Sequence, residues 1–193
     1  SIRRQRQMCI RDRANTGTID PNKDIEKQLD KDKTFDNRSI SHPFEPGSVA
    51  KIITAAAVIQ EGLTTPDEVL QVPGSIDMAG VNVSDAWQHG VEPYTTTGVF
   101  GKSSNVGTLM LADRLGQDKY DDYLKKFGLG QTTGIELPNE SAGLVPDKSQ
   151  WSGGTFANLP IGQGQSWTAL QLASIYQTPV SYTHLRAHET RGN

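Results

Sequence analysis

The chain has 193 residues, with 35% hydrophobic and 21% charged side chains, as expected for one soluble globular domain. Its formal charge of −3 is unevenly distributed, because residues 14–179 hold 12 basic and 20 acidic side chains, a balance of −8. An acidic segment without a basic stripe argues against nucleic acid as a partner. No run reaches the ~18 to 20 apolar residues that a membrane-spanning helix needs.

The two ends of the chain are related through their codons. The peptide "QMCIRD" at 7–12 can be encoded by CAG ATG TGT ATA AGA GAC, and the reverse complement of that DNA encodes "VSYTHL" at 180–185. An inverted repeat of this kind is typical of transposon ends and sequencing adapters, and such segments are set aside before a fold is considered. We therefore expect residues 1–13 and 180–193 to be artefactual and adapter-derived, and residues 14–179 to form a partial natural domain.

With the two terminal segments set aside, the natural segment loses side chains that would otherwise suggest redox or metal chemistry. Cys9 is the only cysteine, so the natural segment contains none and gives no indication of redox compartment. His184 and His188 form an H-x-x-x-H pair that would resemble a metal site, but both lie in the terminal segment. The sequence therefore predicts no metal site.

The first half of the chain predicts a buried helix between polar segments. Residues 14–41 carry charges of both signs and predict a solvated loop or a short surface helix. Residues 49–59 are apolar on nearly every face, which is typical of a helix buried on several sides, and Gly62 supplies its stop. Residues 69–84 alternate around Pro73-Gly74 and Gly80, which indicates a hairpin.

The second half predicts three further helical regions. Residues 94–116 form two helical pieces interrupted by polar residues at 102–105. The segment "DKYDDYLKKFGLG" predicts an amphipathic helix. Its core face would consist of Tyr120, Tyr123, Leu124 and Phe127. Residues 143–165 predict a glycine-rich loop, followed by a helix at about 167–177. A phosphate-binding loop is disfavoured there because no Gly-Lys-Ser/Thr follows.

The stretch "FEPGSVAK" presents a possible nucleophile. A serine hydroxyl needs a base to become nucleophilic, and a lysine three residues along a helix faces the same side as the serine. Burial under a helix N-terminus would lower the pKa of that lysine. Ser48 and Lys51 therefore form a candidate nucleophile and base. The alternative is a helix cap beside a solvated lysine, because serine is a preferred N-cap.

The stretch "GKSSNVGT" offers a second pair of polar groups. Ser103 and Asn105 fall at the break between two helical pieces, where side chains can project into a cleft. A hydroxyl there can relay a proton, and an amide can hold a peptide bond of a substrate. The alternative is that Ser103 or Ser104 only caps the following helix.

Together these motifs resemble the serine penicillin-recognising enzymes, in which Ser-x-x-Lys is followed by Ser-x-Asn. The surrounding "ANTGTIDPN", "KKFGLGQTTGIELP", "SAGLVP" and "LPIGQGQSWTALQLA" are similar to the transpeptidase domain of class B penicillin-binding proteins, in the septal cell-division form of actinobacteria. The likeness covers residues 14–179 in order.

The resemblance implies an α+β fold, the serine β-lactamase/penicillin-binding-protein transpeptidase fold, truncated mainly to its helical lobe. It implies Ser48 as acylated nucleophile, Lys51 as general base, Ser103 as proton relay and Asn105 as substrate-orienting amide. The implied function is peptidoglycan D,D-transpeptidation in septal wall synthesis, with no metal or organic cofactor. The implied partners are D-Ala-D-Ala stem peptides, β-lactam antibiotics and membrane proteins of the division complex.

The sequence departs from the family in one motif. The family's Lys-Thr/Ser-Gly, on a strand that lines the substrate groove, is absent. We therefore expect the fragment alone to be inactive and its full-length parent to be active. The parent is expected to be anchored in the cytoplasmic membrane with this domain outside, and the fragment to lack the anchor. The alternatives are an inert fragment or division-complex scaffold and, among enzymes, a β-lactamase or β-lactam sensor.

Overall fold

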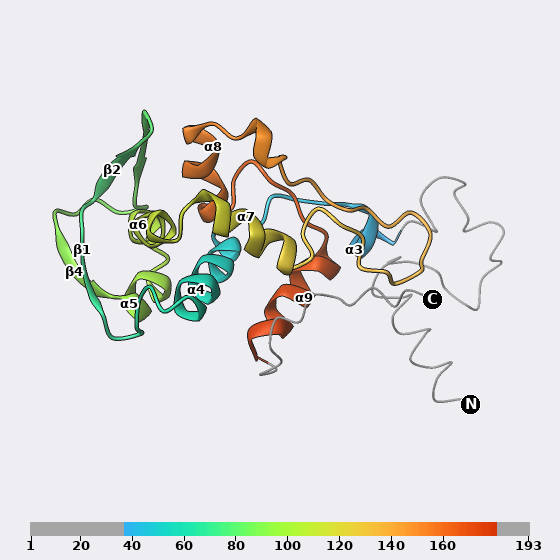
Figure 1. Ribbon diagram of the computed structural model, residues 1–193, viewed down its shortest axis with the longest axis horizontal. Coiled ribbons are helices and arrows are strands. Elements are labelled where there is room, and N and C mark those ends of the chain that lie inside the picture. The colour runs from blue at the N-terminus through green and yellow to red at the C-terminus, as the bar shows by residue number, and fades with distance from the viewer. Residues whose placement is uncertain (1–36, 181–193) are drawn as a thin grey trace, which may run out of the picture.

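The computed structural model describes residues 37–180, except for the side chains of residues 179 and 180. The flanking segments predicted to be adapter-derived, except for residue 180, and most of the polar segment predicted at 14–41 lie outside the described residues. The described part is an α+β fold with helices at its centre and two small sheets at one end (Figure 1). Its helices are α3 (Arg38–Ser41), α4 (Lys51–Gln60), α5 (Thr96–Gly101), α6 (Asn105–Leu115), α7 (Gln117–Lys126), α8 (Gly153–Asn158) and α9 (Ala169–Val180).

Helix α4 lies at the centre and packs against α6, α7 and α9. Its sequence "KIITAAAVIQ" predicts burial on several sides, and Ile53, Ala57 and Val58 are fully buried. Helix α7 adds the expected aromatic stripe, since Tyr120 and Tyr123 are both buried in the same core. The predictions of a buried helix and of an amphipathic one are therefore confirmed.

The strands form two antiparallel pairs. Strand β1 (Val69–Val72) pairs with β4 (Glu92–Thr95), and β2 (Ser75–Met78) pairs with β3 (Val81–Ser84). The hairpin turn is Ala79-Gly80, where both residues have positive φ, as two-residue hairpin loops require. The hairpin predicted over residues 69–84 is present over 75–84, because the chain leaves β1 at Pro73-Gly74 and starts a second sheet there.

The break predicted between two helical pieces is present. Helix α5 ends at Gly101 and α6 begins at Asn105, so the polar residues between them form a tight turn instead of a continuous helix. This turn faces the start of α4, because α4 packs against both α5 and α6.

The segment predicted as a glycine-rich loop contains more helix than expected. It includes the 3₁₀ turns η2 (Lys148–Gln150) and η3 (Leu159–Ile161), with α8 between them and capped by Ser152. Phe156 and Leu159 are buried, which explains why short helices form despite the glycines. After η3 the chain runs beside the segment that leads into α4.

Candidate active site

Ser48 lies in a single 3₁₀ turn, η1 (Gly47–Ala50), directly before α4. The backbone N–H of Lys51 donates to the carbonyl of Ser48, which is the i to i+3 bond of that turn. Side chains three residues apart in a 3₁₀ turn are nearly eclipsed. The turn therefore places Ser48 and Lys51 on one side of the backbone.

The alternative interpretation of Ser48 as a helix cap is not supported by its geometry. The N-cap of η1 is Pro46 and that of α4 is Ala50, and neither end has a side-chain capping bond. The Ser48 side chain is exposed. Its hydroxyl is thus not used to hold the helix and can meet a ligand.

The turn that carries Ser48 is braced by a distant backbone. The N–H of Gly47 donates to the carbonyl of Gly162 at 3.1 Å, and the N–H of Gly164 donates to Glu45 Oε1 at 3.0 Å. A Cβ added to Gly162 would lie 1.8 Å from the oxygen of Gly47. Only glycine permits this close approach, so the "GQG" segment at 162–164 fixes the position of the turn that carries Ser48.

Lys51 is the buried charge at the centre of the site. Lys51 is only 4% exposed, and its Nζ donates three hydrogen bonds. These reach the carbonyl of Ser103 at 2.6 Å, the hydroxyl of Ser103 at 3.0 Å and Asn105 Oδ1 at 2.7 Å. Three acceptors match the three protons of an ammonium group. The interpretation of Lys51 as a solvated surface lysine is therefore excluded.

Burial lowers the pKa of the Lys51 ammonium to about 8, although the nearby Asp85 carboxylate acts in the opposite direction. A lysine with its ordinary pKa is a poor base at neutral pH, because almost none of it is uncharged. With a pKa near 8, roughly one molecule in ten carries neutral Lys51 at pH 7. Such a population is sufficient for general-base chemistry.

Ser103 occupies a strained position at the turn between α5 and α6. Its φ is +57°, a left-handed conformation that non-glycine residues rarely adopt. The neighbouring Ser104, not Ser103, caps α6, since its Oγ accepts from the N–H of Gly107 at 2.9 Å. The cap interpretation therefore applies to Ser104 and leaves the Ser103 hydroxyl for Lys51. Strain of this kind is concentrated at functional sites.

Asn105 is fixed at both ends of its amide. Oδ1 accepts from Lys51, and Nδ2 donates to the carbonyl of Ser84 at 3.1 Å on strand β3. One Nδ2 proton is left over in this arrangement, because a primary amide has two. The bond to Ser84 links the site to the hairpin sheet.

Three of the four predicted site residues are joined by hydrogen bonds: Lys51, Ser103 and Asn105. Ser48 lies one turn before Lys51, and within residues 37–180 no hydrogen bond joins its side chain to Ser103 or Asn105. Sequence reasoning missed Gly162 and Asp85, which support the site without being part of a motif. Among residues 37–180, no group of three His, Cys, Asp or Glu side chains could hold a metal ion.

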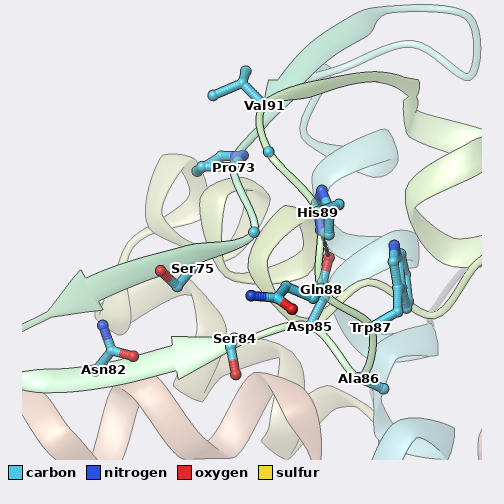
Figure 2. A pocket seen from close by; sticks show the side chains of 12 residues that line it. Pro73, Ser75, Asn82, Ser84, Asp85, Ala86, Trp87, Gln88, His89 and Val91 are labelled. Carbon is cyan, nitrogen blue, oxygen red and sulfur yellow. Dashed lines mark hydrogen bonds and ion pairs between the residues drawn. The ribbon is translucent and has the colours of Figure 1, made fainter.

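Beside Asn105 lies an open hollow of about 580 Å³, between the start of β2, the end of β3 and the loop that follows it. Figure 2 shows Ser84, Asp85 and His89 along it, with Asp85 and His89 joined by a polar contact. Asp85 and Ser84 thus lie between the hollow and the turn that carries Ser103.

Residues 12–186 match the family model described as penicillin binding protein transpeptidase domain. The chain belongs to this family. The family resemblance predicted from the motifs is therefore confirmed, and so is the α+β transpeptidase fold. The boundaries proposed at residues 13 and 180 stay predictions.

Two curated relatives illustrate the range of similarity. Penicillin-binding protein PbpB of Mycobacterium tuberculosis is 66% identical over 164 residues, which is 85% of this chain and 24% of the relative. Peptidoglycan D,D-transpeptidase FtsI of Escherichia coli is 37% identical over 147 residues, 76% of this chain and 24% of the relative. The chain thus spans about a quarter of the length of these relatives.

Solved structures have the same fold. Penicillin binding protein 3 from Mycobacterium tuberculosis, complexed with ampicillin, superposes with a TM-score of 0.78 at 66% identity, covering 83% of this chain and 35% of that one. A peptidoglycan synthetase from Bifidobacterium adolescentis gives a TM-score of 0.73 at 32% identity, covering 78% of this chain and 28% of that one. No helix within residues 37–180 has the length and apolar character needed to cross a bilayer.

Proposed function

We propose that this chain is part of a peptidoglycan D,D-transpeptidase in which Ser48 is the acylated nucleophile. The observation that carries the proposal is the position of Lys51, one 3₁₀ turn after Ser48 and bonded to both Ser103 and Asn105. Similarity to proteins named peptidoglycan D,D-transpeptidase supplies the substrate class, a D-Ala-D-Ala stem peptide.

The proton inventory of Lys51 explains how it would act as a base. When Lys51 is charged, all three of its protons are donated. After losing one proton it still donates to the Ser103 carbonyl and to Asn105 Oδ1, neither of which can donate in return. Its lone pair then faces a hydroxyl, that of Ser103 or of Ser48. The two fixed acceptors thus orient the base.

In the acylation step, Lys51 takes the proton of Ser48 while Oγ attacks the carbonyl between the two D-alanines. The C–N bond breaks, and the departing D-alanine amine receives a proton that Lys51 passes through the Ser103 hydroxyl. In the second step, the transfer of the acyl group to the acceptor, these roles are reversed. The amine of a neighbouring stem attacks the acyl-enzyme, gives up a proton to the same pair and releases Ser48, leaving a crosslink.

Asn105 would orient the substrate in both steps. Its free Nδ2 proton is directed by the bond of the same nitrogen to the Ser84 carbonyl and can be donated to a peptide carbonyl of the stem. β-Lactams would acylate Ser48 by the same attack on a strained amide. The chemistry uses only side chains of the protein, without a metal or organic cofactor.

The wider setting is proposed from the relatives. A role in septal wall synthesis places this domain outside the cytoplasmic membrane, in a full-length protein that is anchored there and contacts membrane proteins of the division complex. The proposal is tested on the full-length protein by exposure to a fluorescent penicillin, followed by gel fluorescence. We expect a labelled band that disappears in Ser48→Ala. Equal labelling of both proteins would contradict the proposal.

A further inference from the structure

Asp85, immediately after β3, is a buried carboxylate that the proposed chemistry does not use. Its side chain has no exposed surface, and its two oxygens contact three groups from two parts of the chain, the start of α6 and the loop after β3. Oδ1 accepts from the backbone N–H of Val106 at 3.0 Å, and Oδ2 accepts from the Ser104 hydroxyl at 2.8 Å. Oδ2 also contacts Nε2 of His89 at 3.1 Å. A buried carboxylate is retained only when such partners stabilise it.

Two of these partners lie on either side of Asn105. The carboxylate holds the side-chain hydroxyl of Ser104, which follows Ser103 directly, and the backbone N–H of Val106. Ser104 is tied twice, because its Oγ donates to Asp85 and accepts from Gly107. Since Ser103 has a positive φ, its turn would relax without such supports.

The charge of Asp85 also reaches the proposed base. It favours the charged form of Lys51, and it is the one charged neighbour that perturbs Lys51 appreciably within the described residues. The imidazole of His89, which contacts Asp85, stacks on Trp87, and the ammonium of Lys102 lies over the Trp87 and Tyr94 rings.

We propose that Asp85 is a positioning residue of this transpeptidase site, whose carboxylate fixes the turn carrying Ser103 and Asn105 and sets the charge balance of the base. The inference rests on the proposed function. The contact with Asp85 also holds the His89 ring. Within the described region Nδ1 of His89 is buried without a partner, and Nε2 makes the one hydrogen bond of the ring. Asp85 does not touch the reacting atoms.

The test is the pH dependence of acylation by a fluorescent penicillin in the full-length protein and its Asp85→Asn variant. Asparagine keeps the shape and can accept from Val106, but it has no charge and no second oxygen to accept from the Ser104 hydroxyl. We expect the plateau rate to fall about 10-fold to 100-fold. The midpoint of the rise with pH should also move downward, because a neutral neighbour no longer favours charged Lys51.

Two variants serve as controls. Asp121→Asn removes another buried aspartate, paired with Lys125 on α7 away from the site, and should keep both rate and midpoint. His89→Gln removes the imidazole that contacts Asp85 Oδ2 and should keep the wild-type midpoint. A midpoint that moves in His89→Gln as far as in Asp85→Asn would assign the effect to His89 and overturn the proposal.

The outcomes separate this proposal from the proposed function. A folded Asp85→Asn protein with the wild-type rate, or with a reduced rate and an unmoved midpoint, would overturn the positioning role. If Asp85→Asn does not fold, Ser104→Ala decides the matter, because it removes the contact with Asp85, together with the cap on Gly107, and keeps the Asp85 charge. It should acylate several-fold more slowly at an unmoved midpoint, and a wild-type rate would overturn the proposal. Failure of the proposed function is distinct, since wild type would then not be labelled at Ser48 at all.

Discussion

The ammonium of Lys51 donates to the carbonyl oxygen of Ser103 at 2.6 Å, although the two residues lie 52 positions apart in the chain. This bond joins the start of α4 to the turn before α6, and the Ser103 hydroxyl and Asn105 complete the contact. A short turn with a left-handed serine is thus held directly against a buried lysine. The proposed acylation chemistry depends on this junction.

Lys51→Met should retain the buried alkyl chain and remove the base. We expect acylation by a fluorescent penicillin to fall at least about 100-fold, the lower end of what general-base catalysis contributes. Lys119→Met is the matched control, because that lysine is exposed and pairs with Glu61 on the surface. Both variants should be compared by initial labelling rates. A Lys51→Met rate within a few-fold of wild type would exclude Lys51 as the base.

The pH dependence of acylation follows from the lowered pKa of Lys51. The group is an active base only when neutral, so the rate should rise about tenfold per pH unit from pH 6 and level off above about 8. Rates measured from pH 6 to 9 on the full-length protein test this expectation. A flat profile over that range would mean that Lys51 is not the group that takes the proton.

Ser103→Gly separates the hydroxyl from the backbone geometry. Glycine adopts a φ of +57° without strain, so the folded state should be unchanged or stabilised by about 0.5 to 1 kcal/mol. Loss of the relay should nevertheless reduce acylation by about 100-fold. Urea unfolding gives the free energy, and labelling gives the rate. Wild-type acylation in this variant would show that the Ser103 hydroxyl is dispensable.

Gly162→Ala should displace the turn that carries Ser48. Its Cβ would lie 1.8 Å from the Gly47 oxygen, and the φ of +86° adds strain. We expect a loss of at least about 2 kcal/mol in the free energy of unfolding and slower acylation in the fraction that remains folded. The control is Gly62→Ala, which has a similar φ of +66° but open space around it. Equal losses in both would mean that the contact with Gly47 is unimportant.

The central helices and the Ser-x-x-Lys and Ser-x-Asn motifs could be predicted because their signals are local. The apolar run of α4 and the polar break between α5 and α6 are visible in a few consecutive residues, and both are present. The choice between Ser103 and Ser104 as the cap could not be made, because either serine has the chemistry. The hydrogen bond that Ser104 Oγ accepts from the N–H of Gly107 decides it, and that geometry is not encoded by residue type alone.

The supports of the site could not be predicted for a related reason. Gly47 and Gly162 meet across more than a hundred residues, and a single sequence gives no sign of which glycines approach each other. Asp85 lies in a polar segment where an aspartate usually faces water, and it becomes buried only because the N-terminus of α6 packs against it. The pairing of β1 with β4, and not with its neighbour β2, likewise has no local signal in the sequence.

The most direct test of the account is to find which residue a penicillin modifies. The full-length protein is incubated with the antibiotic, digested and analysed by mass spectrometry of its peptides. The account predicts one penicilloyl adduct, on Ser48, and its absence in Ser48→Ala. An adduct on another residue, or an undiminished adduct in the Ser48→Ala protein, would contradict the assignment of Ser48 as the nucleophile.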